Sequence, residues 1–463
     1  MPRALETSHL VITGSTGTGK STILRGLLRQ IARRGETAIV LDPECELTPE
    51  FYDPNREDVI LNPTDARCPF WSPWLELTAE GDAQTLATSV IPDPPERLSG
   101  NEMYFVNSAR ELFVTLLERV PNHDPQELSR VLFGPVSQLL TLIENTPAAS
   151  HVMADAPDQR GGVISTLQIA LMGFRFLPPE HPQMWSARRW QEQRHGWLFL
   201  PCRESDRASV LSMQSLWLDA LIRRLLDTEF VRARQERVWI VIDELATLRR
   251  LQHLEDILTR GRKRGVAVVL GFQAVPQLRK LYGRDTTATI LAAPAVKLFL
   301  RTGEPETARW CSEAIGHREV IRPTESETAG PEDLRDAISV SYQRKEESLV
   351  LASELQQLPA LQGYLSVAGH DVASVAFPVL SAVVKQPGFI PRTPSHDTSQ
   401  SPPLSIAAVP AGSPRVLVMK PLPVRAGEEN EAEETVSASA ITAEEVSPAQ
   451  QLDLFPVEQK RKL

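Results

Sequence analysis

The stretch that decides the fold is GSTGTGKS, residues 14–21, which fits the phosphate-binding pattern G-x-x-x-x-G-K-[ST]. An apolar run at residues 9–13 precedes it and indicates a strand, and residues 20–34 have the spacing of an amphipathic helix. Glycines let consecutive backbone N–H groups turn inward onto phosphate oxygens, and the helix N-terminus adds its positive dipole end. A glycine-rich turn without a ligand would not account for these flanks. The stretch therefore predicts a nucleotide site on an α/β fold.

Two residues of this loop have side chains suited to nucleotide chemistry. Lys20 can reach the β- and γ-phosphates of ATP, and the Ser21 hydroxyl can bind the accompanying Mg²⁺. We therefore expect ATP and Mg²⁺ as cofactors. The expected nucleotide-binding residues are Gly14, Ser15, Thr16, Gly17, Thr18, Gly19, Lys20, Ser21 and Thr22.

An apolar run far along the chain ends in two acidic residues. VWIVI, residues 238–242, is followed directly by Asp243 and Glu244. In a nucleotide hydrolase, Asp243 would hold Mg²⁺ through water and Glu244 would polarise the attacking water. By itself, the pair could equally be a strand that ends in an exposed acidic turn. The phosphate loop in the same chain favours the catalytic interpretation.

Two further catalytic candidates follow the acidic pair. The strand expected at residues 266–272 ends at Gln273, whose amide could sense the γ-phosphate or could cap the next helix; we favour the sensor. The basic cluster at residues 260–264 could be a solvated helix end stabilised by the helix dipole. Alternatively, Arg262 could reach a neighbouring subunit's nucleotide site as an arginine finger. These residues alone leave that choice open.

Strand and helix patterns indicate how the chain is organised. Strand-like runs alternate with helical stretches, which predicts a parallel sheet covered by helices on both faces. Lys20 and Asp243 lie 223 residues apart (243 − 20), and the sequence between about 80 and 195 has helical spacing. We therefore expect a nucleotide-binding domain in two parts, residues 1–80 and 196–385, with an inserted all-α domain at residues 81–195.

The composition excludes several classes of protein. The 463 residues are 42% hydrophobic and 23% charged, enough to bury a core, but no apolar stretch reaches the roughly 18–20 residues of a membrane span. No apolar segment follows Met1 as in a secretory signal, and the four cysteines are far apart, which argues against disulfides or a zinc site. We therefore expect a cytoplasmic protein. The net charge of −10 implies that nucleic-acid contact uses a local basic patch.

The last part of the chain, residues 386–463, has a different composition. It is rich in Pro, Ser, Thr and Ala, and residues 428–445 contain seven glutamates and no Lys or Arg. Such a composition cannot bury enough apolar surface to offset the entropy of ordering, so we expect a disordered acidic tail. QLDLF, from Gln451 to Phe455, looks like the peptide by which bacterial replication proteins bind the sliding clamp. An arbitrary apolar patch would look the same.

Several longer stretches together resemble one known family. They are TAIVLDPE (residues 37–44), EFYDPNREDVILNPTDARCPFWSPW (50–74), VWIVIDELATL (238–248), GRKRGVAVVLGFQAVPQL (261–278) and QGYLSVAG (362–369). With the phosphate loop, and over about residues 5–385, they closely resemble the coupling proteins of bacterial conjugation, the TraD/TrwB-type ATPases of type IV secretion systems. The pattern DPxRxDxxLNPxDxRxxxW at residues 53–71 is much more specific than a phosphate loop.

The resemblance implies a RecA-like P-loop motor domain with an inserted all-α domain, assembled as a homo-hexamer around a DNA channel. It implies that ATP hydrolysis drives single-stranded plasmid DNA and its bound relaxase toward the secretion channel. The implied partners are single- and double-stranded DNA without strong sequence preference, the relaxosome and channel components. Position by position, the resemblance assigns Lys20 and Ser21 to Walker A, Asp243 and Glu244 to Walker B, Arg262 to the arginine finger, and Gln273 to motif III.

The sequence departs from the family at its start. Family members usually carry an N-terminal membrane anchor, and here only thirteen residues precede Gly14. We expect either a truncated chain or a variant that docks on a separate membrane subunit. In both cases the protein would work at the cytoplasmic face of the bacterial inner membrane.

A DNA channel needs basic groups on its inner surface, because phosphate neutralisation supplies most sequence-independent affinity. Two candidate clusters are Arg279, Lys280 and Arg284 near Tyr282, and Arg188, Arg189 and Arg194 with Trp185, Trp190 and Trp197. The first could equally be a solvated surface. For the second we favour aromatic core residues beneath a solvated surface.

The main hypothesis is an ATP-driven DNA translocase that acts as a conjugative coupling protein. A soluble FtsK/HerA-like hexameric DNA pump is one alternative, but the block at residues 53–71 and the insertion between the Walker motifs argue against it. A nucleotide-gated adaptor that recruits the relaxosome or the sliding clamp is the other. The complete hydrolytic set of Lys20, Asp243 and Glu244 argues against an adaptor.

Overall fold

The centre of the protein is a nine-stranded sheet. The computed structural model describes residues 3–95, 100–152, 157–178, 181–229, 236–328 and 337–392, and residues 1–395 form one compact unit. In sheet order the strands are β11 (Ala373–Ala376), β10 (Gln362–Val367), β7 (Val296–Leu300), β1 (Leu10–Thr13), β6 (Val266–Phe272), β5 (Val238–Ile242), β2 (Thr37–Asp42), β4 (Leu198–Pro201) and β3 (Val59–Ile60). Neighbours from β7 to β3 are parallel, whereas β10 is antiparallel to β7 and β11. The expected parallel sheet is confirmed, with an antiparallel extension at one edge.

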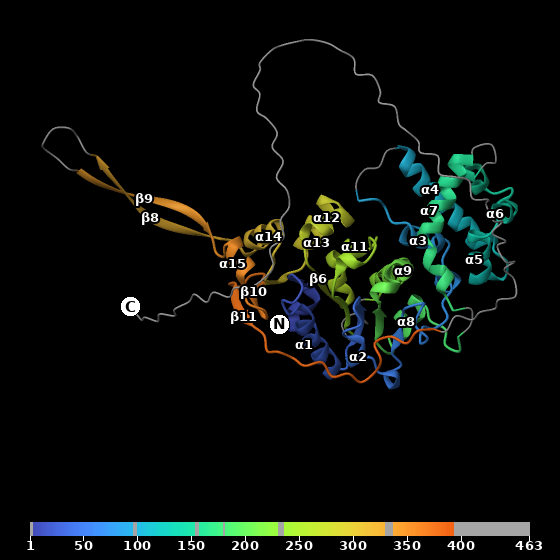
Figure 1. Ribbon diagram of the computed structural model, residues 1–463, viewed down its shortest axis with the longest axis horizontal. Coiled ribbons are helices and arrows are strands. Elements are labelled where there is room, and N and C mark those ends of the chain that lie inside the picture. Colours follow the sequence, from blue (N-terminus) through green and yellow to red (C-terminus); the bar gives the residue numbers. More distant parts are fainter. Residues whose placement is uncertain are drawn as a thin grey trace, which may run out of the picture. The chain divides into compact units, whose positions relative to one another are not determined.

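Helices cover both faces of the sheet (Figure 1). Successive side chains of a strand point to opposite faces. In β1, Ile12 packs in a core with Leu24 and Leu28 of α1, whereas Val11 belongs to the core on the other face. The helices of the nucleotide-binding part are α1 (Lys20–Arg33), α2 (Thr48–Phe51), α9 (Arg207–Leu226), α11 (Leu254–Arg260), α12 (Val275–Tyr282), α13 (Arg284–Ala292), α14 (Pro305–Ile315) and α15 (Ala352–Gln357). Residues of α9, α11, α12 and α13 contribute to the core that contains Val11.

A helical region lies between β3 and β4 in the chain. Its helices are α3 (Asp82–Val90), α4 (Gly100–Arg119), α5 (Pro125–Phe133), α6 (Val136–Ile143), α7 (Pro157–Ala170) and α8 (Ala187–Gln193). Their apolar side chains join the core beneath α9: Phe174 packs edge-on against Trp71 and Phe113, and Trp71 packs against Trp217 of α9. The limits of an inserted domain at residues 81 and 195 remain a prediction. None of the described helices combines the length and apolar character that crossing a bilayer requires.

A β-hairpin follows α14, in a stretch for which the sequence indicates no strands. β8 (His317–Thr328) and β9 (Ala337–Ser348) are antiparallel and pair with each other, with His317 opposite Ser348. Their sequences are rich in Glu, Ser, Thr and Arg and lack the sustained apolar alternation by which a half-buried strand is recognised.

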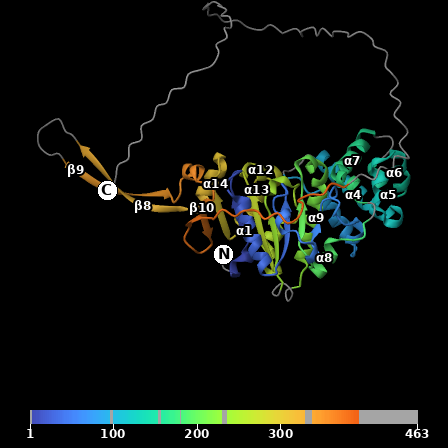
Figure 2. The same cartoon turned by 60° about the horizontal axis from the view of Figure 1, so that its bottom comes forward.

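After β11 the chain forms an extended segment, residues 381–392, which we call the strap. It is the orange trace that runs from β11 past α1 and α2 toward α8 (Figure 1, Figure 2). The N–H of Ala66 donates to the carbonyl of Ile390 (2.8 Å), and the N–H of Arg392 donates to that of Thr64 (2.9 Å). The structure thus differs from the expected start of the tail at residue 386, because backbone hydrogen bonds hold the chain through Arg392. The remainder, including QLDLF, lies outside the described residues.

Candidate nucleotide-binding site

The phosphate loop joins the C-terminal end of β1 to the first turn of α1. The N–H of Ser15 donates to the carbonyl of Arg301 (2.9 Å), and the N–H of Leu361 donates to that of Thr18 (2.9 Å). The Thr18 hydroxyl closes the turn by donating to the carbonyl of Ser15 (2.8 Å). These bonds tie the loop to the chain that follows β7 and to the start of β10.

Two glycines of the loop have conformations that other residues adopt at a cost. Gly17 has φ of 76° and Gly19 has φ of 102°, both in the left-handed region. Glycine is favoured at position 14 for a steric reason, because a Cβ there would lie 2.7 Å from the Thr18 hydroxyl oxygen. The loop therefore favours glycine at three positions, two for their backbone conformation and one for lack of space.

A cavity of about 510 Å³ lies over the loop and brings the distant motifs together. Its lining residues are Ser15, Thr16, Gly17, Gly19, Lys20, Ser21, Thr22, Pro43, Glu44, Glu46, Arg207, Asp243, Glu244, Thr247 and Gln273. Most of the residues expected to bind nucleotide are thus on one wall, and the acidic pair and the glutamine expected from β5 and β6 join them. This arrangement follows from the sheet order, because β1, β6 and β5 are parallel neighbours whose C-terminal ends meet at one edge.

Lys20 and Glu244 form an ion pair inside this cavity. The Lys20 ammonium donates to Glu244 Oε2 at 2.9 Å, and about a tenth of each side chain is exposed, 11% and 10%. The second oxygen of Glu244 is buried and has no hydrogen-bond partner among the described residues. In this state the proposed base of the reaction is therefore held by the lysine expected to bind phosphate.

Asp243 lies beside this pair and is short of partners. Its side chain is buried, and Oδ1 has no hydrogen-bond partner among the described residues. Burial raises the pKa of Asp243 to about 7; Lys20 opposes this shift, while the carboxyls of Asp42, Glu244 and Glu46 add to it. A buried carboxyl with a raised pKa and an unpaired oxygen favours binding of a cation.

Gln273 and Arg262 have different positions relative to the cavity. Gln273 lines it, and the Thr16 hydroxyl donates to Gln273 Oε1 at 3.3 Å, so the amide contacts the phosphate loop. Arg262 is exposed on a short 3-10 helix, Gly261–Arg264, and is not among the lining residues. Arg262 is thus placed away from the nucleotide cavity of its own chain.

Three charged residues of the lining escape sequence reasoning. Glu44 and Glu46 follow β2, and Arg207 begins α9 after β4. Arg207 pairs with Glu204 (2.6 Å), and its Nε is buried without a hydrogen-bond partner among the described residues. The one available signal is position, since each follows the C-terminal end of a parallel strand, where α/β sheets bind ligands.

The sequence of this chain matches a known protein family. A family profile described as "Type IV secretion-system coupling protein DNA-binding domain" matches residues 1–378. The chain belongs to this family. The resemblance to the coupling proteins of type IV secretion is therefore confirmed, and so is the expected RecA-like P-loop fold.

Individual coupling proteins show how far the likeness extends. Coupling protein TraD of Escherichia coli (strain K12) is 29% identical over 402 residues, which covers 84% of this chain and 55% of TraD. The chain thus spans about half the length of that curated relative. TrwB in complex with the ATP analogue ADPNP has a TM-score of 0.73 at 28% identity, covering 85% of this chain and 90% of the TrwB chain in that structure. TrwB in complex with ADP and Mg²⁺ has a TM-score of 0.72 at 29% identity, covering 84% and 89%.

The two basic–aromatic clusters of this coupling-protein family member contain buried aromatic rings. Tyr282 is 1% exposed, and its hydroxyl accepts a hydrogen bond from the N–H of Leu251. Trp185, Trp190 and Trp197 are also buried, as favoured for the second cluster. These aromatic rings therefore belong to the core and are not available as a stacking surface for bases.

Proposed function

We propose that this chain is the motor part of a conjugative coupling protein, which hydrolyses ATP and uses the free energy to move DNA. The observation that carries the proposal is the cavity over the phosphate loop, where Lys20 pairs with Glu244 and two buried carboxylate oxygens have no partner in the described part of the chain. The related TrwB structures with ADPNP and with ADP and Mg²⁺ support ATP and Mg²⁺ as the cofactors of this chain.

The lining residues fit a magnesium-bound triphosphate. Mg²⁺ in such sites takes one or two protein oxygens and completes its shell with phosphates and waters. Ser21 and Asp243 would supply the protein oxygens, and in the described part of the chain no cluster of three or more His, Cys, Asp or Glu could hold a metal by itself. The ion would neutralise phosphate charge. It would also compensate the buried charge of Asp243.

Phosphate binding would change the partner of Lys20. A triphosphate competes with Glu244 for the Lys20 ammonium, because both are anions within reach of the same cation. Lys20 would then bind the β- and γ-phosphates, and Glu244 would be free to polarise the attacking water. Gln273, bonded to Thr16, would relay the presence of the γ-phosphate to β6 and α12. Hydrolysis would therefore begin only after nucleotide binding has separated Glu244 from Lys20.

Family membership supports a proposal for assembly and partners. We propose a homo-hexamer in which Arg262, exposed and outside its own cavity, reaches the γ-phosphate of the neighbouring subunit. DNA without strong sequence preference would be the substrate, and the relaxosome and the type IV secretion channel the partners, at the cytoplasmic face of the inner membrane. The stretch from Gln451 to Phe455 is proposed as a docking peptide for the sliding clamp.

The test is ATP hydrolysis by the purified chain with and without single-stranded DNA. DNA should stimulate hydrolysis, and Lys20→Ala and Glu244→Gln should each lower kcat by at least ~10²-fold, because each removes a group that acts on the transition state. Glu80→Gln, an exposed glutamate, is the matched control and should leave kcat unchanged. If the chain bound nucleotide but showed no Glu244-dependent hydrolysis, either with or without DNA, that result would contradict a motor and favour the adaptor.

A further inference from the structure

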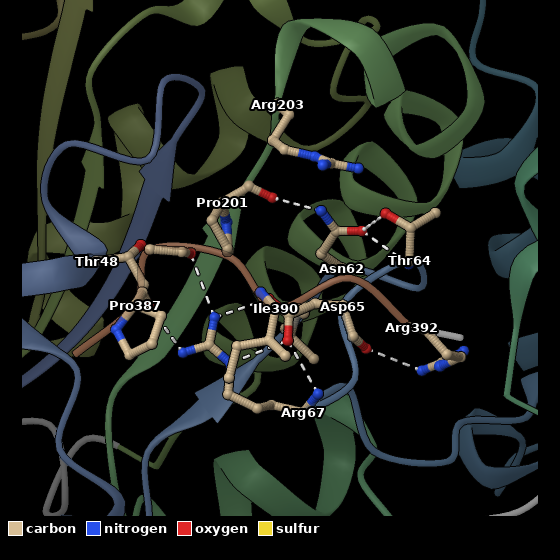
Figure 3. A network of polar contacts seen from close by, with 12 residues as sticks. Thr48, Asn62, Thr64, Asp65, Arg67, Pro201, Arg203, Pro387, Ile390 and Arg392 are labelled. Carbon is tan, nitrogen blue, oxygen red and sulfur yellow. Dashed lines mark hydrogen bonds and ion pairs between the residues drawn. The ribbon is translucent and has the colours of Figure 1, made fainter. Parts of the chain in front are cut away.

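The strap lies on a docking surface made of three segments: residues 43–49, 62–67 and 203–206. Figure 3 shows the strap passing over the side chains of this surface. At one end, the N–H groups of Lys385 and Gln386 donate to the carbonyl of Pro49 at 2.8 and 3.0 Å. At the other end, the backbone pairs with residues 64–66, as described above. The strap is thus attached at both ends by backbone hydrogen bonds.

Asp65 and Arg67 form the centre of this surface (Figure 3). Arg67 Nη2 donates to Asp65 Oδ2 at 2.7 Å, and the Asp65 side chain is fully buried. The same oxygen accepts the N–H of Ile390 (3.1 Å), and Arg67 Nη1 donates to the carbonyl of Pro387 (2.9 Å). Both residues belong to the block at residues 53–71. In this part of the block, the polar side chains bind the strap.

The first segment, residues 43–49, also borders the nucleotide cavity. Glu44 and Glu46 line the cavity, whereas the carbonyl of Pro49 accepts hydrogen bonds from the strap. Gly388 comes so close that a Cβ on it would lie 3.0 Å from the carbonyl oxygen of Cys45. A short loop therefore has the nucleotide cavity on one side and the strap on the other.

The turn between β4 and α9 has the same two-sided character. Arg207 lines the cavity, and its Nη2 donates to the carbonyl of Pro43 at 3.5 Å. Arg203, one turn earlier, lies over the ring of Phe389 with 3.9 Å from its guanidinium carbon to the ring centroid. Asp206 accepts from the Arg203 guanidinium at 2.6 Å and holds it there. The nucleotide cavity and the strap are thus separated by two short segments that contact each other through Arg207 and Pro43.

The strap buries little apolar surface. Val383 and Val384 are 52% and 74% exposed. Its attachment is mostly polar: backbone hydrogen bonds, side-chain hydrogen bonds that include those of Asp65 and Arg67, and the cation–π contact of Phe389 with Arg203. Segments with few buried apolar contacts open with low free energies, so small changes in the docking surface change their occupancy.

We propose that nucleotide binding tightens the docking of the strap. This inference rests on the nucleotide site of the proposed function. Bound phosphates would attract Arg207, which lines the cavity and also donates to the carbonyl of Pro43, and this contact would hold both shared segments in place. Once the first partner has ordered the docking surface, binding of the second costs less conformational entropy, so nucleotide and strap stabilise each other. The nucleotide state would thereby set how firmly the chain is held up to residue 392.

Amide hydrogen exchange of the full chain tests the proposal directly. The probe is ADPNP with Mg²⁺, and binding is measured separately with a fluorescent nucleotide. The amides of Lys385, Gln386, Ile390 and Arg392 should exchange at least ~5-fold more slowly with nucleotide bound, and Lys20→Ala should abolish the effect. Bound nucleotide with unchanged or faster exchange would overturn this inference alone. Absence of binding would overturn the proposed function together with it.

Thermodynamic reciprocity supplies a second test. Gly388→Val places a side chain against Cys45 and Pro49 and should displace the strap without altering the sheet. Because coupling acts equally in both directions, this variant should bind ADPNP about 5-fold more weakly. Val384→Ala, on an exposed part of the strap, is the matched control and should bind normally. Unchanged affinity in Gly388→Val, with the strap shown by exchange to be released, would overturn the coupling.

Discussion

The nucleotide cavity and the clamp that residues 62–67 form on the strap both follow the C-terminal ends of parallel strands. They treat buried polar atoms in opposite ways. In the cavity, Asp243 and Glu244 each keep one buried oxygen without a partner among the described residues. In the clamp, Asp65 accepts hydrogen bonds from Arg67 and from the N–H of Ile390. Asn62 donates to the carbonyl of Pro201 (2.9 Å) and accepts from the N–H of Thr64 (2.9 Å).

The difference teaches how to interpret two motifs of similar polarity. A buried polar atom without a partner costs about 1–3 kcal/mol, and that cost is recovered when a ligand supplies the partner. A clamp that binds its own chain already has its partners and gains nothing from a small ligand. The phosphate loop and the block at residues 53–71 identify the same family. Their hydrogen-bond partners favour different roles, ligand binding at the cavity and attachment of the strap at the clamp.

The largest effect on stability that separates the two regions is expected at the clamp. Asp65→Ala leaves the Arg67 guanidinium without its buried carboxylate and removes the acceptor of Ile390. Breaking a buried pair in this way costs about 3 kcal/mol. Urea unfolding should therefore show a loss of that size, while kcat at saturating ATP stays within about twofold, because Asp65 is not among the lining residues of the cavity.

The control for this variant is the exposed Asp371→Ala, which should change the free energy of unfolding by less than about 0.5 kcal/mol. If Asp65→Ala instead abolished hydrolysis while the protein remained folded, the block at residues 53–71 would be part of the catalytic machinery. The contrast between cavity and clamp would then be wrong.

A smaller effect of opposite sign is expected in the cavity. Burial raises the pKa of Asp243 from 3.8 to about 7, so the folded protein holds a proton that the unfolded chain releases. The contribution of Asp243 to the free energy of unfolding therefore falls as the pH rises from about 4 to about 7. Above that range the loss has reached its full size. Without nucleotide and Mg²⁺, Asp243→Asn should raise the free energy of unfolding at pH 8 by about 2 kcal/mol.

Thermal unfolding at pH 5 and pH 8 checks this expectation. The gain of Asp243→Asn should shrink at pH 5, where most of the wild-type carboxyl is protonated in the folded state. Saturating Mg²⁺ and ADPNP should reverse the order of stability, because the wild-type carboxylate gains a cation. A variant less stable than wild type at pH 8 without ligand would show that Asp243 already has its partner.

The positions of the candidate catalytic residues are largely predictable from the sequence. Residues 238–242 and 266–272 are continuous apolar runs because both faces of these strands are buried, and such strands are bounded by recognisable polar residues. The C-terminal ends of parallel strands share one edge, so residues that follow different strands were expected together. Lys20, Asp243, Glu244 and Gln273 do line one cavity. Their catalytic roles stay a prediction.

The strap and Arg207 were not accessible in the same way. Backbone groups make most of the hydrogen bonds at residues 385–392, and every residue type except proline has both the N–H and the carbonyl. The composition of this segment therefore indicates only that it buries little apolar surface. Arg207 is one of several arginines near the start of a helix, and no spacing distinguishes it. The hairpin strands β8 and β9 are mostly polar and give no apolar period. Tertiary contacts, rather than local pattern, place these features.

The smallest expected effect distinguishes the two sides of a single turn. Arg207→Ala removes a cation from the cavity wall and should lower kcat about tenfold, equivalent to ~1.4 kcal/mol. The expected loss is no larger because Arg207 is partly exposed and already paired with Glu204. Arg203→Ala removes the contact with Phe389 and should leave kcat unchanged while the amides of Phe389, Ile390 and Arg392 exchange faster. Steady-state ATPase and hydrogen exchange on both variants measure the two outcomes. Since the residues lie only four positions apart, a shared loss of kcat would mean that the turn responds as one unit, and strap attachment would then be part of the catalytic cycle itself.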